Sequence, residues 1–129
     1  MKNLLLAGLI LLGKQTSAQP VLQIVAQLGT IKDSVTTVQK ILVNPWLIVV
    51  DEKKNKTHFT VIGFTLTITE PSGEYILLKS TSLNNYLTKE QINSIKLSGS
   101  GSRLLFTDLR ATCPDCRIPA LPDLSLEIK

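Results

Sequence analysis

Apolar side chains recur at every second position along much of this chain, and a period of two is typical of β-strands. The first such stretch has its apolar residues at alternate positions: Leu22, Ile24, Ala26 and Leu28. The same period predicts further strands at residues 59–69, 104–111 and 124–128, and residues 75–78 are expected as the return strand of a hairpin. Residues 46–50 are apolar throughout, which predicts a central strand with both faces covered.

The strand predicted at residues 59–69 changes phase near Gly63. Phe59 and Val61 share one parity, and three later apolar residues share the other: Phe64, Leu66 and Ile68. A bulge at Gly63 would bring both sets to one face, and the alternative is a strand that changes partners there. The next four residues, 70–73, are Glu-Pro-Ser-Gly and predict the tight turn of a hairpin.

One helix is well signalled, over about residues 88–97. Thr88 is placed as its N-cap, and Gln91 three residues later would complete a capping box. Leu87 before the cap and Ile92 after it are spaced as a hydrophobic staple. We therefore expect this helix to be fixed to the apolar core at its first turn.

A second, shorter helix is predicted within residues 33–42. Asp33 could cap it and Val35, Val38 and Leu42 would be buried, although the β-branched Thr and Val residues of this segment disfavour a helix. About six or seven strands with one clear helix predict a mainly β fold. We expect a single domain built as an antiparallel β-sandwich with one short helix.

Residues 1–18 have the three parts of a secretory signal peptide. Lys2 supplies a positive start, residues 4–12 supply an apolar run, and residues 16–18 supply small side chains for cleavage. A permanent membrane anchor is the alternative, but a spanning helix needs about twenty apolar residues. We therefore expect a periplasmic or secreted domain, residues 19–129, with no stable membrane anchor after processing.

The charge of the chain is too small to indicate a nucleic-acid partner. Its net charge is +4, and cleavage would remove Lys2 and Lys14. The dense basic stretch at residues 53–56, Lys-Lys-Asn-Lys, follows two acidic residues and lies between apolar runs. This context favours a solvated turn over a phosphate site.

Cys113-Pro114-Asp115-Cys116 is the sharpest motif in the chain. Cysteines of an exported protein are expected to be oxidised, and the motif admits a structural disulfide, a redox-active pair or half of a metal site. A thioredoxin-type pair opens a helix, whereas Pro119 and Pro122 oppose a helix here. A structural disulfide between Cys113 and Cys116 is therefore the favoured prediction.

Residues for metal binding or catalysis are scarce. His58 is the single histidine, and with two cysteines it falls short of the four ligands that zinc usually takes. With this single histidine, the sequence also contains no recognisable catalytic triad. Asp108, an acid with core-like neighbours, is interpreted as capping a turn or pairing with Arg103 or Arg110 rather than as a catalytic group. We expect no enzymatic activity, no metal and no cofactor.

Four segments match a known domain in their order and spacing. They are residues 59–68, 87–92 and 104–111, and the turn Pro114-Asp115 with Arg117, Ile118 and Leu121 after it. In this pattern the chain resembles the C-terminal domain of GldM, a gliding-motility and type IX secretion protein. Two departures are Cys116, where the family has a glycine, and Cys113 before the proline. The resemblance extends more loosely to residues 21–42 and to the strand at residues 46–50, and so covers most of residues 19–129.

The resemblance implies an immunoglobulin-like periplasmic module without an active site. GldM-like proteins form a periplasmic shaft, and their last domain is thought to contact a ring at the outer membrane. This chain has room for one such domain, which implies a free-standing interaction module with protein partners in the cell envelope. The alternative function is a thiol-disulfide redox protein that uses Cys113 and Cys116. No oligomeric state follows from the pattern.

Overall fold

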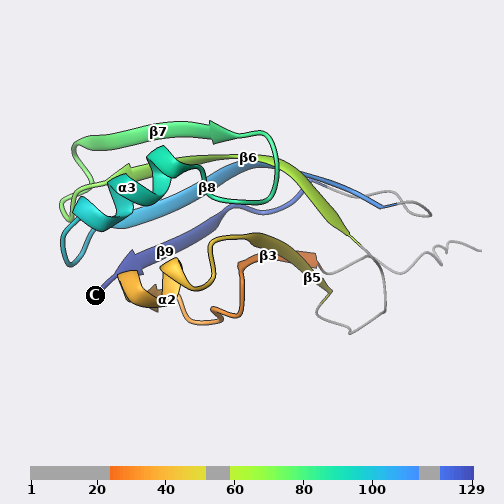
Figure 1. The fold of residues 1–129 in the computed structure, drawn as a ribbon, viewed down its shortest axis with the longest axis horizontal. Helices are drawn as coiled ribbons and strands as arrows, with labels where there is room; N and C mark the ends of the chain where they lie inside the picture. Colours follow the sequence, from red (N-terminus) through yellow and green to blue (C-terminus); the bar gives the residue numbers. More distant parts are fainter. Residues whose placement is uncertain (1–23, 52–58, 114–119) are drawn as a thin grey trace, which may run out of the picture.

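The computed structural model describes residues 24–51, 59–113 and 120–129, which form a mainly β fold with two short helices (Figure 1). The strands are β3 (Ile24–Leu28), β4 (Val35–Thr36), β5 (Leu47–Asp51), β6 (Thr60–Thr69), β7 (Ile76–Ser82), β8 (Arg103–Thr112) and β9 (Leu124–Ile128). The helices are α2 (Val38–Leu42) and α3 (Lys89–Leu97). The predicted signal peptide lies outside the described residues.

Five strands form one sheet in the order β4-β9-β8-β6-β7, and β3 and β5 form a separate antiparallel pair. Neighbours in the larger sheet are antiparallel, except that β4 runs parallel to β9. The prediction of purely antiparallel strands is therefore wrong at this position. Because β4 enters the sheet from β3, and not through a hairpin from its neighbour, no tight turn imposes the antiparallel direction.

The strand predicted at residues 46–50 exists as β5, but the prediction that it is central is wrong. Among the described strands, β5 pairs along its length only with β3. One face of β5 carries Leu47, which is buried in the core, and the other face is only partly covered. The apolar pattern correctly predicted a strand and incorrectly predicted how many neighbours it has.

The segment 33–42 also differs from its prediction, because its first half is extended. Val35 and Thr36 form β4, and the helix begins only after Thr37, whose side-chain oxygen accepts a hydrogen bond from the backbone N–H of Lys40 at 3.3 Å. Ile41 is the fully buried residue of this helix. The β-branched residues thus formed a strand instead of a first helical turn.

The predicted bulge in β6 is confirmed. The register between β6 and β8 shifts on both sides of Gly63. Val61 and Phe64 are both buried, while Ile62 between them is 44% exposed. The predicted turn that follows is confirmed as well, since the N–H of Gly73 donates to the carbonyl of Glu70 at 2.9 Å.

The predicted helix is confirmed as α3, with its capping box. The N–H of Gln91 donates to the Thr88 hydroxyl at 3.1 Å, and the Gln91 side-chain oxygen accepts from the N–H of Thr88 at 2.9 Å. Leu87 is buried, and Ile92 packs against the core. Gln91 is fully buried and also donates from its amide nitrogen to the carbonyl of Ser80 at 3.1 Å, so α3 is bonded to the edge strand β7.

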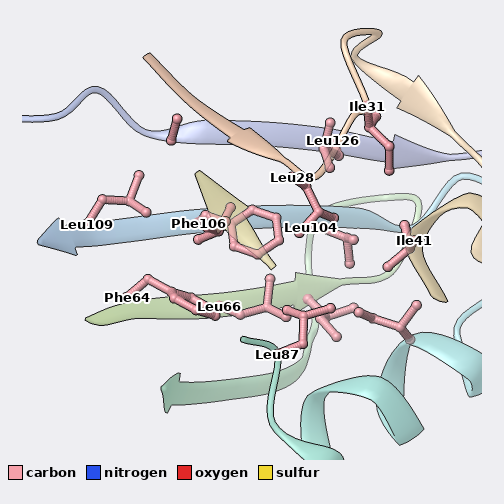
Figure 2. Packing of buried hydrophobic residues seen from close by; sticks show 14 of the residues in the cluster. Leu28, Ile31, Ile41, Phe64, Leu66, Leu87, Leu104, Phe106, Leu109 and Leu126 are labelled. Atoms are coloured by element: carbon pink, nitrogen blue, oxygen red, sulfur yellow. The ribbon is translucent and has the colours of Figure 1, made fainter. Parts of the chain in front are cut away.

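The core lies between the β3–β5 pair and one face of the larger sheet (Figure 2). Phe64 of β6 and Phe106 of β8 lie at its centre, with ring centroids 5.7 Å apart and planes tilted by 57°, an arrangement that aromatic pairs favour. The smaller sheet contributes Leu28, and α2 contributes Ile41. Among the described residues, these side chains belong to one cluster of buried apolar groups.

Candidate functional site

The cysteine motif is only partly within the described residues. Cys113 comes directly after β8 and is disulfide-bonded, whereas Cys116 lies outside the described residues. The first cysteine of a structural disulfide and the first cysteine of a redox motif can both lie directly after a strand. The location of Cys113 therefore does not distinguish the two predictions. The pairing of Cys113 with Cys116 therefore stays a prediction.

Asp108 lies at an irregular point of β8 and is exposed. Its φ of 50° is positive, which is uncommon for a residue other than glycine, although Asp tolerates it better than most. Its carboxylate is 3.9 Å from Nε of Arg110, and Arg103 instead lies 3.7 Å from Glu127. The side chains of Asp108 and Arg110 are at least half exposed. They therefore form an ion pair at the surface, and Asp108 is not a buried acid.

Metal-binding geometry is not found in the part of the chain that the structure describes, where no three His, Cys, Asp or Glu side chains gather. His58, the histidine considered above, lies outside that part. None of the described helices is long and apolar enough to cross a membrane.

An apolar surface is present on the side of the β3–β5 pair that faces away from the core. We call it the outer face and define it by Val25, Trp46, Ile48, Val50 and Tyr86. Val25, Ile48 and Val50 are half-buried and do not belong to the packed core. Gln27, which pairs with Ile48, is a polar residue on the same face. Both faces of β5 are therefore apolar, but only one belongs to the core.

Tyr86 reaches the outer face through a short bridge between two loops. Leu47 donates its N–H to the carbonyl of Asn85 at 2.7 Å, and Leu87 donates its N–H to the carbonyl of Pro45 at 2.9 Å. This bridge sets Trp46 beside Tyr86, with ring centroids 6.3 Å apart and planes tilted by 50°. Sequence reasoning did not find Tyr86, since its partner is forty residues away; the fully apolar stretch at β5 was the available signal.

A groove runs between β3 and β9, which lie close together although they belong to different sheets (Figure 1). Its volume is about 190 Å³. We call it the β3–β9 groove and define it by three segments that line it: residues 25–27, 31–34 and 124–126. Ala26, Ile31 and Leu126 are its buried, apolar residues.

A second hollow, of about 430 Å³, lies beside α2 and is lined by Lys32, Asp33 and Lys40 among others. The Asn44 side chain in its wall is fully engaged within the fold. Its oxygen accepts from the N–H and hydroxyl of Thr30, at 2.9 and 3.0 Å, and its nitrogen donates to the carbonyl of Lys40 at 2.9 Å. The charged side chains that line this hollow have both signs and are all exposed. The hollow therefore favours no ligand of a particular charge, whereas the outer face favours apolar contacts.

No protein-family model matches the chain, and no curated protein is detectably similar to it.

Proposed function

We propose that this chain is a non-enzymatic, exported protein-interaction module with an immunoglobulin-like β-sandwich, and that its partner is a protein of the cell envelope. The observation that carries the proposal is the outer face, a partly exposed surface that is apolar except for Gln27 and has an aromatic pair at one end. Contiguous apolar surface outside the core commonly marks a binding site. Trp and Tyr are also the residues most enriched among those that dominate binding energy.

The location of the outer face supports this function. It lies on the smaller sheet, on the side away from the larger sheet, so a partner could cover it without displacing any part of the core. The resemblance to GldM suggests a periplasmic setting, and the signal-peptide pattern suggests export. A domain of this kind would act as an interaction module related to the gliding and type IX secretion machinery.

The chain offers a matched pair of variants for a test. Tyr86→Ser removes the exposed ring of the outer face, and Tyr75→Ser removes a more exposed ring from the β6–β7 hairpin; Tyr86 is 54% exposed and Tyr75 is 67% exposed. Tagged wild type and both variants would be used to capture proteins from envelope extracts. We expect a protein retained by wild type and Tyr75→Ser and lost by Tyr86→Ser. Equal capture by all three proteins would contradict the proposal.

A further inference from the structure

We infer that the hollow beside α2 binds a small zwitterion of the amino-acid type, which carries both an ammonium and a carboxylate group. We call it the α2 hollow and define it by the residues that line it: 30–33, 35–36, Lys40 and Asn44. Its volume of about 430 Å³ is that of a small-molecule site. The inference goes beyond the proposed protein-binding function, and the α2 hollow shares no residue with the outer face.

The observation that carries the inference is the side chain of Thr36, at the buried side of the hollow. Thr36 is 1% exposed, and its Oγ1 has no hydrogen-bond partner among the described residues. Such a hydroxyl is rare in folded proteins, because it has lost its contact with water without gaining a bond. The neighbouring Asn44 shows the usual case, since Thr30 and Lys40 satisfy its amide oxygen and nitrogen. Because Thr χ1 has more than one staggered rotamer, the Thr36 hydroxyl can turn toward a ligand in the hollow.

The outer edge of β4 adds backbone groups to the same site. The carbonyl of Ser34 accepts from the N–H of Glu127 at 2.8 Å, and that of Thr36 accepts from the N–H of Lys129 at 2.9 Å. Consecutive strand residues direct their N–H and C=O groups to opposite edges, so those of Val35 point away from β9. Among the described strands β4 is the last of its sheet, and Val35 lines the hollow. One residue's donor and acceptor suffice for a small polar ligand.

The charged side chains of the hollow indicate a ligand with both signs of charge. Lys32 and Lys40 supply two ammonium groups, and Asp33 supplies a carboxylate. None of the three forms an ion pair with a described residue, whereas Arg103 and Arg110 do. A purely anionic ligand would be repelled by Asp33, and a purely cationic one by the two lysines. An amino acid avoids both costs, since its carboxylate can lie by a lysine and its ammonium by Asp33.

The aliphatic part of the wall bears on the side chain of the ligand. Ile31 is buried and Val35 is partly exposed, and both line the hollow. None of the described lining residues is aromatic, so an aromatic ring of the ligand would gain no ring contact. We therefore expect amino acids with small or aliphatic side chains to bind more tightly than aromatic ones.

The test titrates the common L-amino acids singly into isotope-labelled protein and follows the amide resonances. We expect saturable shifts centred on residues 30–36 and Lys40. Thr36→Val removes the hydroxyl at nearly constant shape, and Thr36→Ser keeps it as the control. Thr36→Val should bind the best ligand about tenfold more weakly, as expected for a lost hydrogen bond to a charged group. It should be no less stable than wild type in urea, which separates lost binding from lost folding.

Two analogues of the best ligand test whether both charges are needed. The amine without the carboxylate and the acid without the ammonium should each bind about tenfold more weakly than the amino acid. Asp33→Asn should weaken the amino acid but not the acid, and the double variant Lys32→Gln and Lys40→Gln should weaken both. Lys89→Gln with Lys96→Gln removes two exposed lysines of α3 and should change neither affinity.

Several results would overturn the inference: no saturable shift with any amino acid, shifts centred elsewhere, or equal affinity for Thr36→Val. Binding of the acid as tightly as the amino acid would make the hollow an anion site, which also contradicts it. A Thr36→Val variant that is destabilised but binds normally would assign the hydroxyl a purely structural role. Tyr86→Ser should leave amino-acid binding unchanged and Thr36→Val should leave envelope capture unchanged, so failures of the two experiments are separable.

Discussion

Gly29 joins β3 to the loop that leads to β4, and two features of its site require glycine. Its φ is +54°, and an added Cβ would overlap Cβ and Oδ1 of Asn44. We expect Gly29→Ala to lower the free energy of unfolding by about 3 kcal/mol, since the left-handed backbone and the overlap each contribute. Urea denaturation of the purified domain measures this loss.

Two other glycines separate the contributions at Gly29. Gly73 has a φ of +77° with open space around it, so Gly73→Ala should lose only about 1 kcal/mol. Gly99 has open space and no positive φ, so Gly99→Ala should change stability by less than about 1 kcal/mol. A Gly29→Ala loss no larger than that of Gly73→Ala would show that Asn44 moves away at little cost.

The hydroxyl of Thr36 is buried without a hydrogen bond that would offset its loss of contact with water. The residue is 1% exposed, and its Oγ1 has no hydrogen-bond partner among the described residues. Valine has nearly the same shape, so we expect Thr36→Val to raise the free energy of unfolding by about 1 kcal/mol, measured by urea denaturation. Thr65→Val is the control, because the Thr65 hydroxyl is paired with that of Thr81 at 3.2 Å and is exposed. A destabilised Thr36→Val would reveal a hydrogen bond at this hydroxyl.

At the scale of elements, α3 depends on one buried side chain. Gln91 bonds the N–H of Thr88 and the carbonyl of Ser80, so it caps its own helix and attaches that helix to β7. We expect Gln91→Ala to lower the free energy of unfolding by about 2–3 kcal/mol, through the lost cap and a buried carbonyl left without a donor. Urea denaturation checks the global loss, and amide exchange checks local opening of α3.

Glu90→Ala is the matched control for Gln91→Ala. Glu90 precedes Gln91 in the same helical turn, is exposed, and accepts from the Ser80 hydroxyl. Its removal should cost less than about 1 kcal/mol, because the bond is solvated. Equal losses for the two variants would mean that the edge of β7 is held by the hydroxyl contact and not by Gln91.

The elements that could be predicted from the sequence are those whose signals are local. The Thr88–Gln91 capping box and the phase change at Gly63 each depend on neighbouring residues, and both are confirmed. The helix prediction for residues 33–42 was wrong in its first half, because the polar and β-branched residues there suit a strand or a helix nearly equally. Pairing with Glu127 and Ile128 at the far end of the chain made its first part a strand.

At the scale of the molecule, the unpredictable part is which strands share a sheet. The apolar residues of β5 signalled burial on both faces, but the fold places β5 in a two-stranded sheet and leaves its second face on the surface. The outer face and the β3–β9 groove both arise from this arrangement. Neither could be located from the sequence, because each joins residues that only sheet assembly brings together.

The cysteine pair separates the two functions considered for the whole molecule. If Cys113 and Cys116 form a structural clamp, the enclosed loop is so short that the disulfide contributes at most about 2 kcal/mol. Reduction should then leave the domain folded, and the reduction potential should lie below about −300 mV with no exchange with glutathione. Redox titration with mass-spectrometric readout measures this, and the Cys113→Ser and Cys116→Ser double variant should keep envelope capture. A potential above about −230 mV, with fast exchange, would support the thiol-disulfide function instead.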